Sequence, residues 1–106
     1  MSRKEKLDET LKKEVAKIIN REVPVENFLI TISFADCAPD LSQIKIGVSI
    51  LPENKTGTAL KKLRPKTKLI AKSLKEKNNL RRVPKIIWKP DTSPRNLFDI
   101  EEELNK

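Results

Sequence analysis

The chain opens with apolar residues at helical spacing. Between residues 4 and 21 they recur at intervals of four, four, three and one, as Leu7, Leu11, Val15, Ile18 and Ile19. Such intervals place side chains on one face of an α-helix, and charged residues occupy most of the other positions. Proline cannot continue a helix, and one follows closely at position 24. The pattern therefore predicts an amphipathic helix over residues 4–21.

Two later stretches, residues 28–34 and 43–51, alternate apolar and polar side chains with a period of two. The apolar series are Phe28, Ile30, Ile32 and Phe34, and then Ile44, Ile46, Val48 and Ile50. This period is typical of strands with one buried face. The intervening sequence ADCAPDLS is rich in turn-forming residues, so we expect an antiparallel pair.

A second helical pattern runs from about Thr58 to Lys77, with its apolar side formed by Leu60, Leu63, Ile70 and Leu74. Pro65 lies inside this pattern. Because proline lacks an N–H group and clashes with the preceding turn, the helix is expected to kink or break near Arg64. Two consecutive asparagines, Asn78 and Asn79, are expected to end it.

The sequence RVPKIIWK, residues 82–89, predicts a third strand, with Pro84 at its start or at a sheet edge. Ser93 and Pro94 then resemble the cap and first position of a short terminal helix. The predicted order is α-β-β-α(kinked)-β with a short C-terminal helix. This is an α+β chain whose three-stranded sheet packs on helices, and its 106 residues fit one domain.

Charge is distributed unevenly along the chain. Residues 55–89 contain thirteen lysines or arginines and a single acid, Glu76, whereas the whole chain carries a net charge of +8. A solvated helix normally has acids near its lysines, as residues 4–21 do. The pattern therefore favours a polyanionic partner, most commonly nucleic acid, over a merely solvated surface. The segment has too few bulky apolar residues to anchor in a membrane interface.

Catalytic chemistry is sparse in this sequence. There is no histidine, one cysteine and two glycines, so a zinc site, a cysteine–histidine pair and a phosphate-binding glycine loop are not expected. Cys37 is interpreted as a semi-buried filler of the turn between the first two strands, and Asp36 and Asp40 as turn-forming residues. We expect no enzymatic activity, metal, cofactor or small-molecule substrate.

Other features indicate location and mode of contact. No apolar run approaches the roughly 20 residues that span a bilayer, and the charged N-terminus differs from a signal peptide. The single cysteine fits a reducing compartment, so a cytoplasmic location is expected. Nothing in the sequence demands more than a monomer. Trp88 alternates with Ile86 and is interpreted as a core residue rather than a base-stacking platform. Binding is therefore expected to use mainly phosphates and shape.

Two stretches resemble the ribosome-binding factor A family. PDLSQIKIGVS, residues 39–49, is similar to the family segment in which Asp-Leu-Ser leads into an alternating strand. LRRVPKIIWKPDTS, residues 80–93, is similar to the family's Leu-Arg-x-Val-Pro signature, with Trp88 at its aromatic position. The opening helix and NLFDIEEEL, residues 96–104, also correspond, so the resemblance covers nearly the whole chain.

The resemblance implies a single KH-like (type II) domain over residues 1–106. It also implies a factor that binds the small (30S) ribosomal subunit and assists late maturation and 5′-end processing of 16S rRNA, including in the cold. In that family an Ala-x-Gly kink replaces the KH nucleic-acid loop. The corresponding position here, Lys66-Thr67-Lys68, has neither residue, and we expect Pro65 to supply the bend instead. One straight helix over residues 58–77 would contradict this expectation.

The basic segment and the resemblance together predict the residues that contact rRNA. These are Lys61, Lys62, Arg64, Lys66, Lys68, Lys72, Lys75, Arg81, Arg82, Lys85 and Lys89, although helix geometry spreads them over more than one side. Two alternatives are a general single-stranded RNA-binding KH-like module and a structural ribosomal protein. A metal-dependent nuclease using Asp36, Asp40 or Asp91 is disfavoured.

Overall fold

The fold was analysed in a computed structural model that describes residues 2–23 and 27–90. The helices and strands are α1 (Arg3–Glu22), β1 (Leu29–Cys37), β2 (Gln43–Leu51), α2 (Thr56–Leu63), α3 (Thr67–Asn78) and β3 (Lys85–Pro90). A short 3₁₀ turn, η1 (Glu53–Lys55), precedes α2, and another, η2 (Arg64–Lys66), separates α2 from α3. The predicted C-terminal helix lies outside the described residues.

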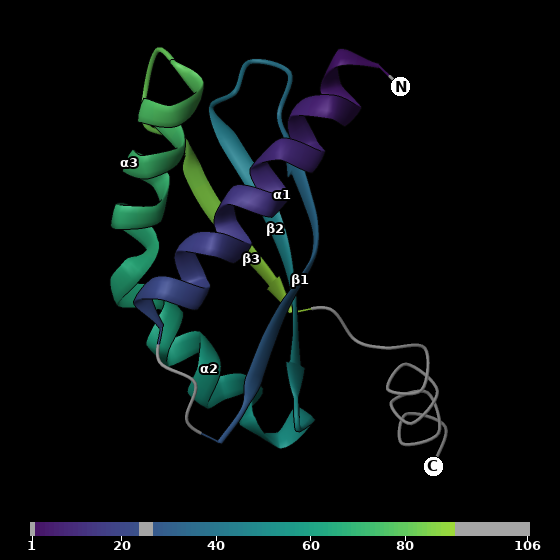
Figure 1. The fold of residues 1–106 in the computed structure, drawn as a ribbon, viewed down its shortest axis with the longest axis vertical. Coiled ribbons are helices and arrows are strands. Elements are labelled where there is room, and N and C mark those ends of the chain that lie inside the picture. The colour runs from purple at the N-terminus through teal and green to yellow at the C-terminus, as the bar shows by residue number, and fades with distance from the viewer. Residues whose placement is uncertain (1, 24–26, 91–106) are drawn as a thin grey trace.

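The three strands form one mixed sheet in the order β1-β2-β3. β1 and β2 pair antiparallel, as the turn-rich connection predicts, whereas β2 and β3 pair parallel. A parallel pair needs a long crossover, and here α2 and α3 supply it. Figure 1 shows α1 lying diagonally across the sheet, with α2 and α3 along the β3 side. This α+β arrangement is KH-like, which confirms the predicted fold class.

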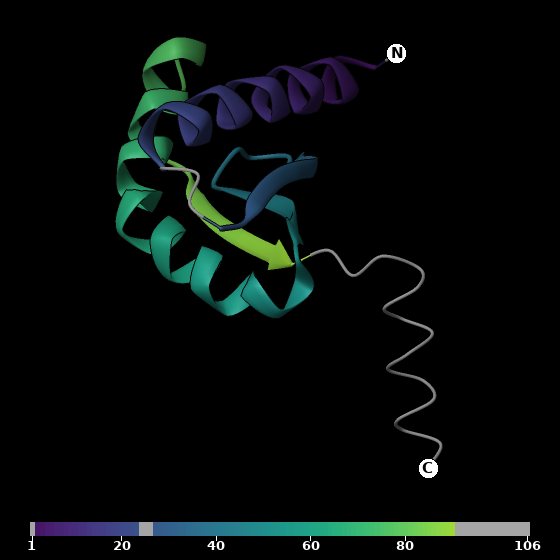
Figure 2. The same cartoon turned by 60° about the horizontal axis from the view of Figure 1, so that its bottom comes forward.

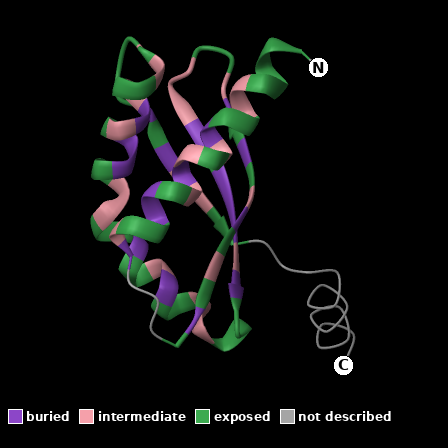
Figure 3. Cartoon of the chain, in the orientation of Figure 1, coloured by how far each residue is buried: buried purple, intermediate pink, exposed green. Residues whose placement is uncertain are grey.

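The core lies between the helices and one face of the sheet. From α1, the side chains of Leu11, Val15 and Ile18 are almost completely buried, and the alternating apolar residues of β2 meet them from below. The buried positions in Figure 3 accordingly follow the inner sides of the helices and the strands behind them. Each such side chain contributes about 1.5–3 kcal/mol by its removal from water. The helical spacing of apolar residues in α1 and their alternation in β2 thus mark the two sides of one core.

Polar contacts attach the start of α1 to the end of β1. Asp8 accepts a hydrogen bond from the Cys37 backbone N–H at 3.1 Å and another from the Lys4 ammonium at 2.8 Å. Partial burial favours a higher pKa for Asp8, but the hydrogen bond from Lys4 and that from Cys37 outweigh it and lower the pKa. Lys4 also pairs with Asp36. The pKa of the Cys37 thiol is raised to about 11, chiefly by burial and then by its contact with Asp8.

A β-bulge overturns one prediction about the first strand. The register between β1 and β2 shifts between Ile32 and Phe34, so Ser33 is an extra residue. An extra residue reverses the alternation beyond it. Phe34 is therefore 39% exposed on the outer face, whereas Ala35 and Cys37 are buried. The expectation that Phe34 shares a buried face with Ile32 is wrong.

Two further predictions need correction. Asp36 and Cys37 belong to β1 rather than to the connecting turn, because the reversed alternation buries Cys37 and Asp8 binds its N–H. The third strand begins at Lys85, not at residue 82, because Pro84 has no N–H and pairing starts with the Lys85 N–H bonding to Ser42 O at 2.9 Å. Asp40 does lie in the turn, where it accepts hydrogen bonds from Ser42.

The bulge makes Gly47 a sensitive position. A Cβ atom there would lie 2.2 Å from the Phe34 ring and 2.5 Å from Ser33 Oγ, whereas a Cβ at Gly57 would meet nothing within 4 Å. We predict that Gly47→Ala lowers the free energy of unfolding by about 1–3 kcal/mol, since inserted atoms force neighbours to move. Gly57→Ala, inside α2, is the matched control and should raise it by up to about 1 kcal/mol. Urea denaturation of both variants tests this, and equal effects would contradict the bulge geometry.

Candidate nucleic-acid interface

The basic segment is built on a helix that Pro65 interrupts. Pro65 lies within η2, between α2 and α3, so the expected break is confirmed. Figure 2 shows the two helices following an arc rather than one straight rod. Proline has no N–H to donate to Lys61 O, and the turn tightens to 3₁₀ pairing, in which the Thr67 N–H donates to Arg64 O. The break directly precedes the position where the family resemblance expects a kink.

Thr67 connects this break to the sheet. Its hydroxyl donates to Leu63 O at 3.2 Å, the carbonyl that regular α-helical pairing would assign to the Thr67 N–H. The same oxygen accepts a hydrogen bond from Trp88 Nε1 on β3 at 3.0 Å. Trp88 packs against the core, as predicted, and its indole N–H is satisfied inside the protein. Thr67 and Trp88 therefore hold the start of α3 against β3.

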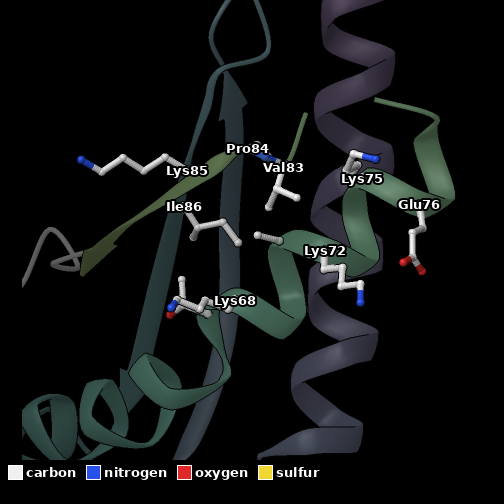
Figure 4. A pocket seen from close by; sticks show the side chains of 10 residues that line it. Lys68, Lys72, Lys75, Glu76, Val83, Pro84, Lys85 and Ile86 are labelled. Carbon is white, nitrogen blue, oxygen red and sulfur yellow. The ribbon is translucent and has the colours of Figure 1, made fainter. Parts of the chain in front are cut away.

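A groove of about 590 Å³ opens between α3 and β3. Its floor consists of Ala71, Val83, Pro84 and Ile86, and Val83 leaves 50% of its surface exposed. Figure 4 shows Lys72 and Lys75 on the α3 side of the floor, whereas the Lys85 side chain extends from β3 away from α3. An apolar floor beside a row of lysines suits a ribose–phosphate chain, because the floor contacts sugars or bases while ammonium groups meet phosphates.

The structure brings only some of the predicted cations together. Four of them, Lys68, Lys72, Lys75 and Lys85, line the groove, with Glu76 as its one acidic neighbour. Arg81 and Arg82 line a separate cavity beyond the end of α3.

The other five predicted cations lie outside both hollows. Lys61 and Lys62 are exposed on α2, and Arg64 is exposed in η2. Lys66 Nζ lies 3.9 Å from Glu22 Oε2, so part of its charge is offset within the protein. Lys89 alternates with Trp88 and therefore projects from the opposite face of β3.

Sequence patterns did not point to Thr67 or Val83 as parts of this site. In the sequence, Thr67 stands out only as the middle residue of Lys66-Thr67-Lys68, and its partner Trp88 is 21 residues away in the chain. The sequence predicts that Val83 is an ordinary strand residue, yet it is exposed just before β3 begins. The one sequence feature that could have indicated Val83 as part of the site is its position beside Pro84 within a basic segment.

Among residues 2–23 and 27–90, no cluster of three or more histidine, cysteine, aspartate or glutamate side chains is arranged to hold a metal ion. No helix of that region is long and apolar enough to cross a membrane.

Comparison with known proteins agrees with the fold and the motifs. The sequence matches the ribosome-binding factor A family over residues 3–104. The chain belongs to this family. A ribosome-binding factor A from Natranaerobius thermophilus is 40% identical over 94 residues, covering 86% of this chain and 71% of that protein. One from Flavobacterium johnsoniae is 30% identical over 108 residues, covering 97% and 83%.

A solved structure supports the fold separately. The crystal structure of ribosome-binding factor A from Thermus thermophilus superimposes with a TM-score of 0.73 at 24% sequence identity. The match covers 84% of this chain and 97% of that one. Membership of the ribosome-binding factor A family, predicted from residues 39–49 and 80–93, is thus confirmed, and the missing Ala-x-Gly does not prevent the family fold.

The contact between Thr67 and Trp88 gives a test of how the groove is held. Thr67→Val keeps the side-chain shape but removes both hydrogen bonds, leaving the partly buried indole N–H without its acceptor. We predict a loss of about 1–2 kcal/mol in the free energy of unfolding, measured by chemical denaturation. Thr67→Ser retains the hydroxyl and should lose less. A valine variant as stable as the serine variant would show that the bond contributes little.

Proposed function

We propose that this chain is a non-catalytic assembly factor that binds the small ribosomal subunit through its 16S rRNA. Its relatives are named for ribosome binding. The observation that carries the proposal is the groove between α3 and β3, which has an apolar floor and four of the predicted cations among its lining residues. This is a surface for a phosphate backbone rather than for a metal-assisted reaction. The assisted steps would be late maturation and 5′-end processing of the rRNA, including in the cold.

The physical basis of docking is release of counterions. Lysines in and near the groove would replace the cations condensed around rRNA phosphates, so affinity should depend steeply on salt. If about six phosphates are contacted, affinity falls on the order of a thousandfold between low and moderate salt. Steering by the net positive charge would also accelerate encounter with the subunit.

A second candidate function is general binding of single-stranded RNA. The apolar floor favours it, because exposed Val83 offers an apolar surface for an unpaired base. The two candidates differ in what competes for the site. A subunit-specific factor should be displaced poorly by unrelated oligonucleotides, whereas a general binder should be displaced well.

The groove lysines provide the main test. We predict that charge reversal at Lys68, Lys72 and Lys85 weakens co-sedimentation with free small subunits at least tenfold, because three cations become three anions beside phosphates. These side chains are exposed, so the variant should remain folded by circular dichroism. Pelleting should be compared with separated small and large subunits at two salt concentrations.

A matched control carries the same change of charge elsewhere. Lys6, Lys13 and Lys17 are exposed on α1, away from the groove, and their reversal should reduce binding much less. Equal losses in both variants, or equal pelleting of the native protein with both subunits, would mean that only overall charge attracts RNA.

A further inference from the structure

A second hollow of about 530 Å³ lies beyond the end of α3, between two connections of the chain. The β1–β2 connection contributes one wall and the α3–β3 connection the other. Their main lining residues are Pro39, Asp40, Leu41, Asn79, Arg81 and Arg82. Its volume falls within the range of about 300–1,000 Å³ that is typical of ligand pockets. Its cations are Arg81 and Arg82 and its acid is Asp40, whereas the cations of the groove are all lysines.

Both walls are held in place by hydrogen bonds. On one side, the Leu41 N–H donates to Ala38 O at 2.9 Å, and the Lys85 N–H donates to Ser42 O at 2.9 Å. On the other, Asn78 Nδ2 donates to Glu14 Oε2 at 2.8 Å and to Leu74 O at 2.9 Å. A ligand entering this hollow therefore meets walls that are already ordered, which lowers the entropic cost of binding.

Asp40 is the lining residue whose carboxylate can still accept hydrogen bonds. Its Oδ1 accepts from the Ser42 hydroxyl at 2.6 Å and from the Ser42 N–H at 3.0 Å. These bonds, the hydroxyl first, hold the pKa of Asp40 below its usual value, so the carboxylate is ionised and can only accept. Each carboxylate oxygen has about two acceptor sites, so Oδ1 is occupied. Oδ2 has no partner among the described residues and remains open.

We propose that this pocket binds an unpaired guanine of RNA, with Asp40 reading its Watson–Crick edge. Guanine presents two neighbouring donors there, N1–H and the N2 amino group, which match an open carboxylate oxygen. Adenine and cytosine place a ring acceptor beside their amino group, and uracil flanks its single N–H with two carbonyls, so each sets a lone pair against the carboxylate. Single-stranded RNA is commonly read in this way.

Arg81 and Arg82 offset the repulsion between the Asp40 carboxylate and RNA phosphates. Arg81 and Arg82 line the same pocket and supply cations for the phosphates that flank the base. Arg82 also contributes to the low pKa of Asp40 through its charge. Without such a reader role, a carboxylate among cations simply weakens attraction for phosphates.

The pocket also continues the proposed RNA path. Residues 78–82 line the pocket, and residues 83–86 line the groove, so one connection of the chain borders both hollows. A strand whose backbone follows the groove lysines can place its next bases toward Asp40. The inference rests on the proposed RNA-binding function and adds a base preference to it.

The test compares RNA oligonucleotides of one length that differ at a single position, measured by fluorescence anisotropy with the full chain. We expect guanine to bind on the order of tenfold more tightly than adenine at that position. Inosine, which lacks the N2 amino group, should bind less tightly than guanine, whereas 7-deazaguanine keeps both donors and should bind equally. No preference in the native protein would overturn the proposal.

Variants separate base reading from charge. Asp40→Asn keeps an acceptor for Ser42 but places an amide where Oδ2 stood, so the preference for guanine should disappear. If Asp40 acts only as a negative charge, the same variant should instead bind every oligonucleotide more tightly by one factor, which would overturn the proposal. Glu76→Gln, beside the groove, is the matched control and should tighten all binding while keeping the preference.

Failure of this inference and failure of the proposed function are distinguishable. Salt-sensitive binding to small subunits with no preference among oligonucleotides would remove only the guanine site. Absence of binding to both oligonucleotides and subunits would remove both.

Discussion

The contact between the Thr67 hydroxyl and the Trp88 indole is the constraint on which the basic surface depends. Pro65 breaks the helical crossover, and α3 begins directly after the break. Thr67 then uses one hydroxyl group to complete the pairing of the helix and to bond the indole N–H of β3. Thr67 also lines the groove between α3 and β3, so this contact joins the two elements beside the groove. The lysines of α3 are thereby held next to its apolar floor.

The broad architecture was predictable because it follows from side-chain periodicity. The spacing of Leu11, Val15 and Ile18 requires a helix with one buried face, and the alternation in residues 43–51 requires a strand with one. Both patterns depend only on near neighbours in the sequence. The break at Pro65 was predictable for the same reason, since a missing N–H acts locally.

Features that depend on distant pairs were not predictable in this way. The bulge at Ser33 exists only in the pairing of β1 with β2, and it moves Phe34 to the outer face above Gly47. The bond between Thr67 and Trp88 and the pocket around Asp40 likewise join segments far apart in the chain. Of the predicted cations, the structure gathers Lys68, Lys72, Lys75 and Lys85, but Lys66 lies near Glu22. Charge in a sequence indicates a class of partner, whereas the fold decides which charges act together.

We propose that α3, the α3–β3 connection and β3 form the face that meets the small subunit. Hydrogen–deuterium exchange of the chain, free and bound to purified small subunits, tests this proposal. We expect slower exchange in residues 67–90 on binding, with little change on the exposed side of α1. Protection confined to α1 or to the outer face of β1, with residues 67–90 unchanged, would contradict it.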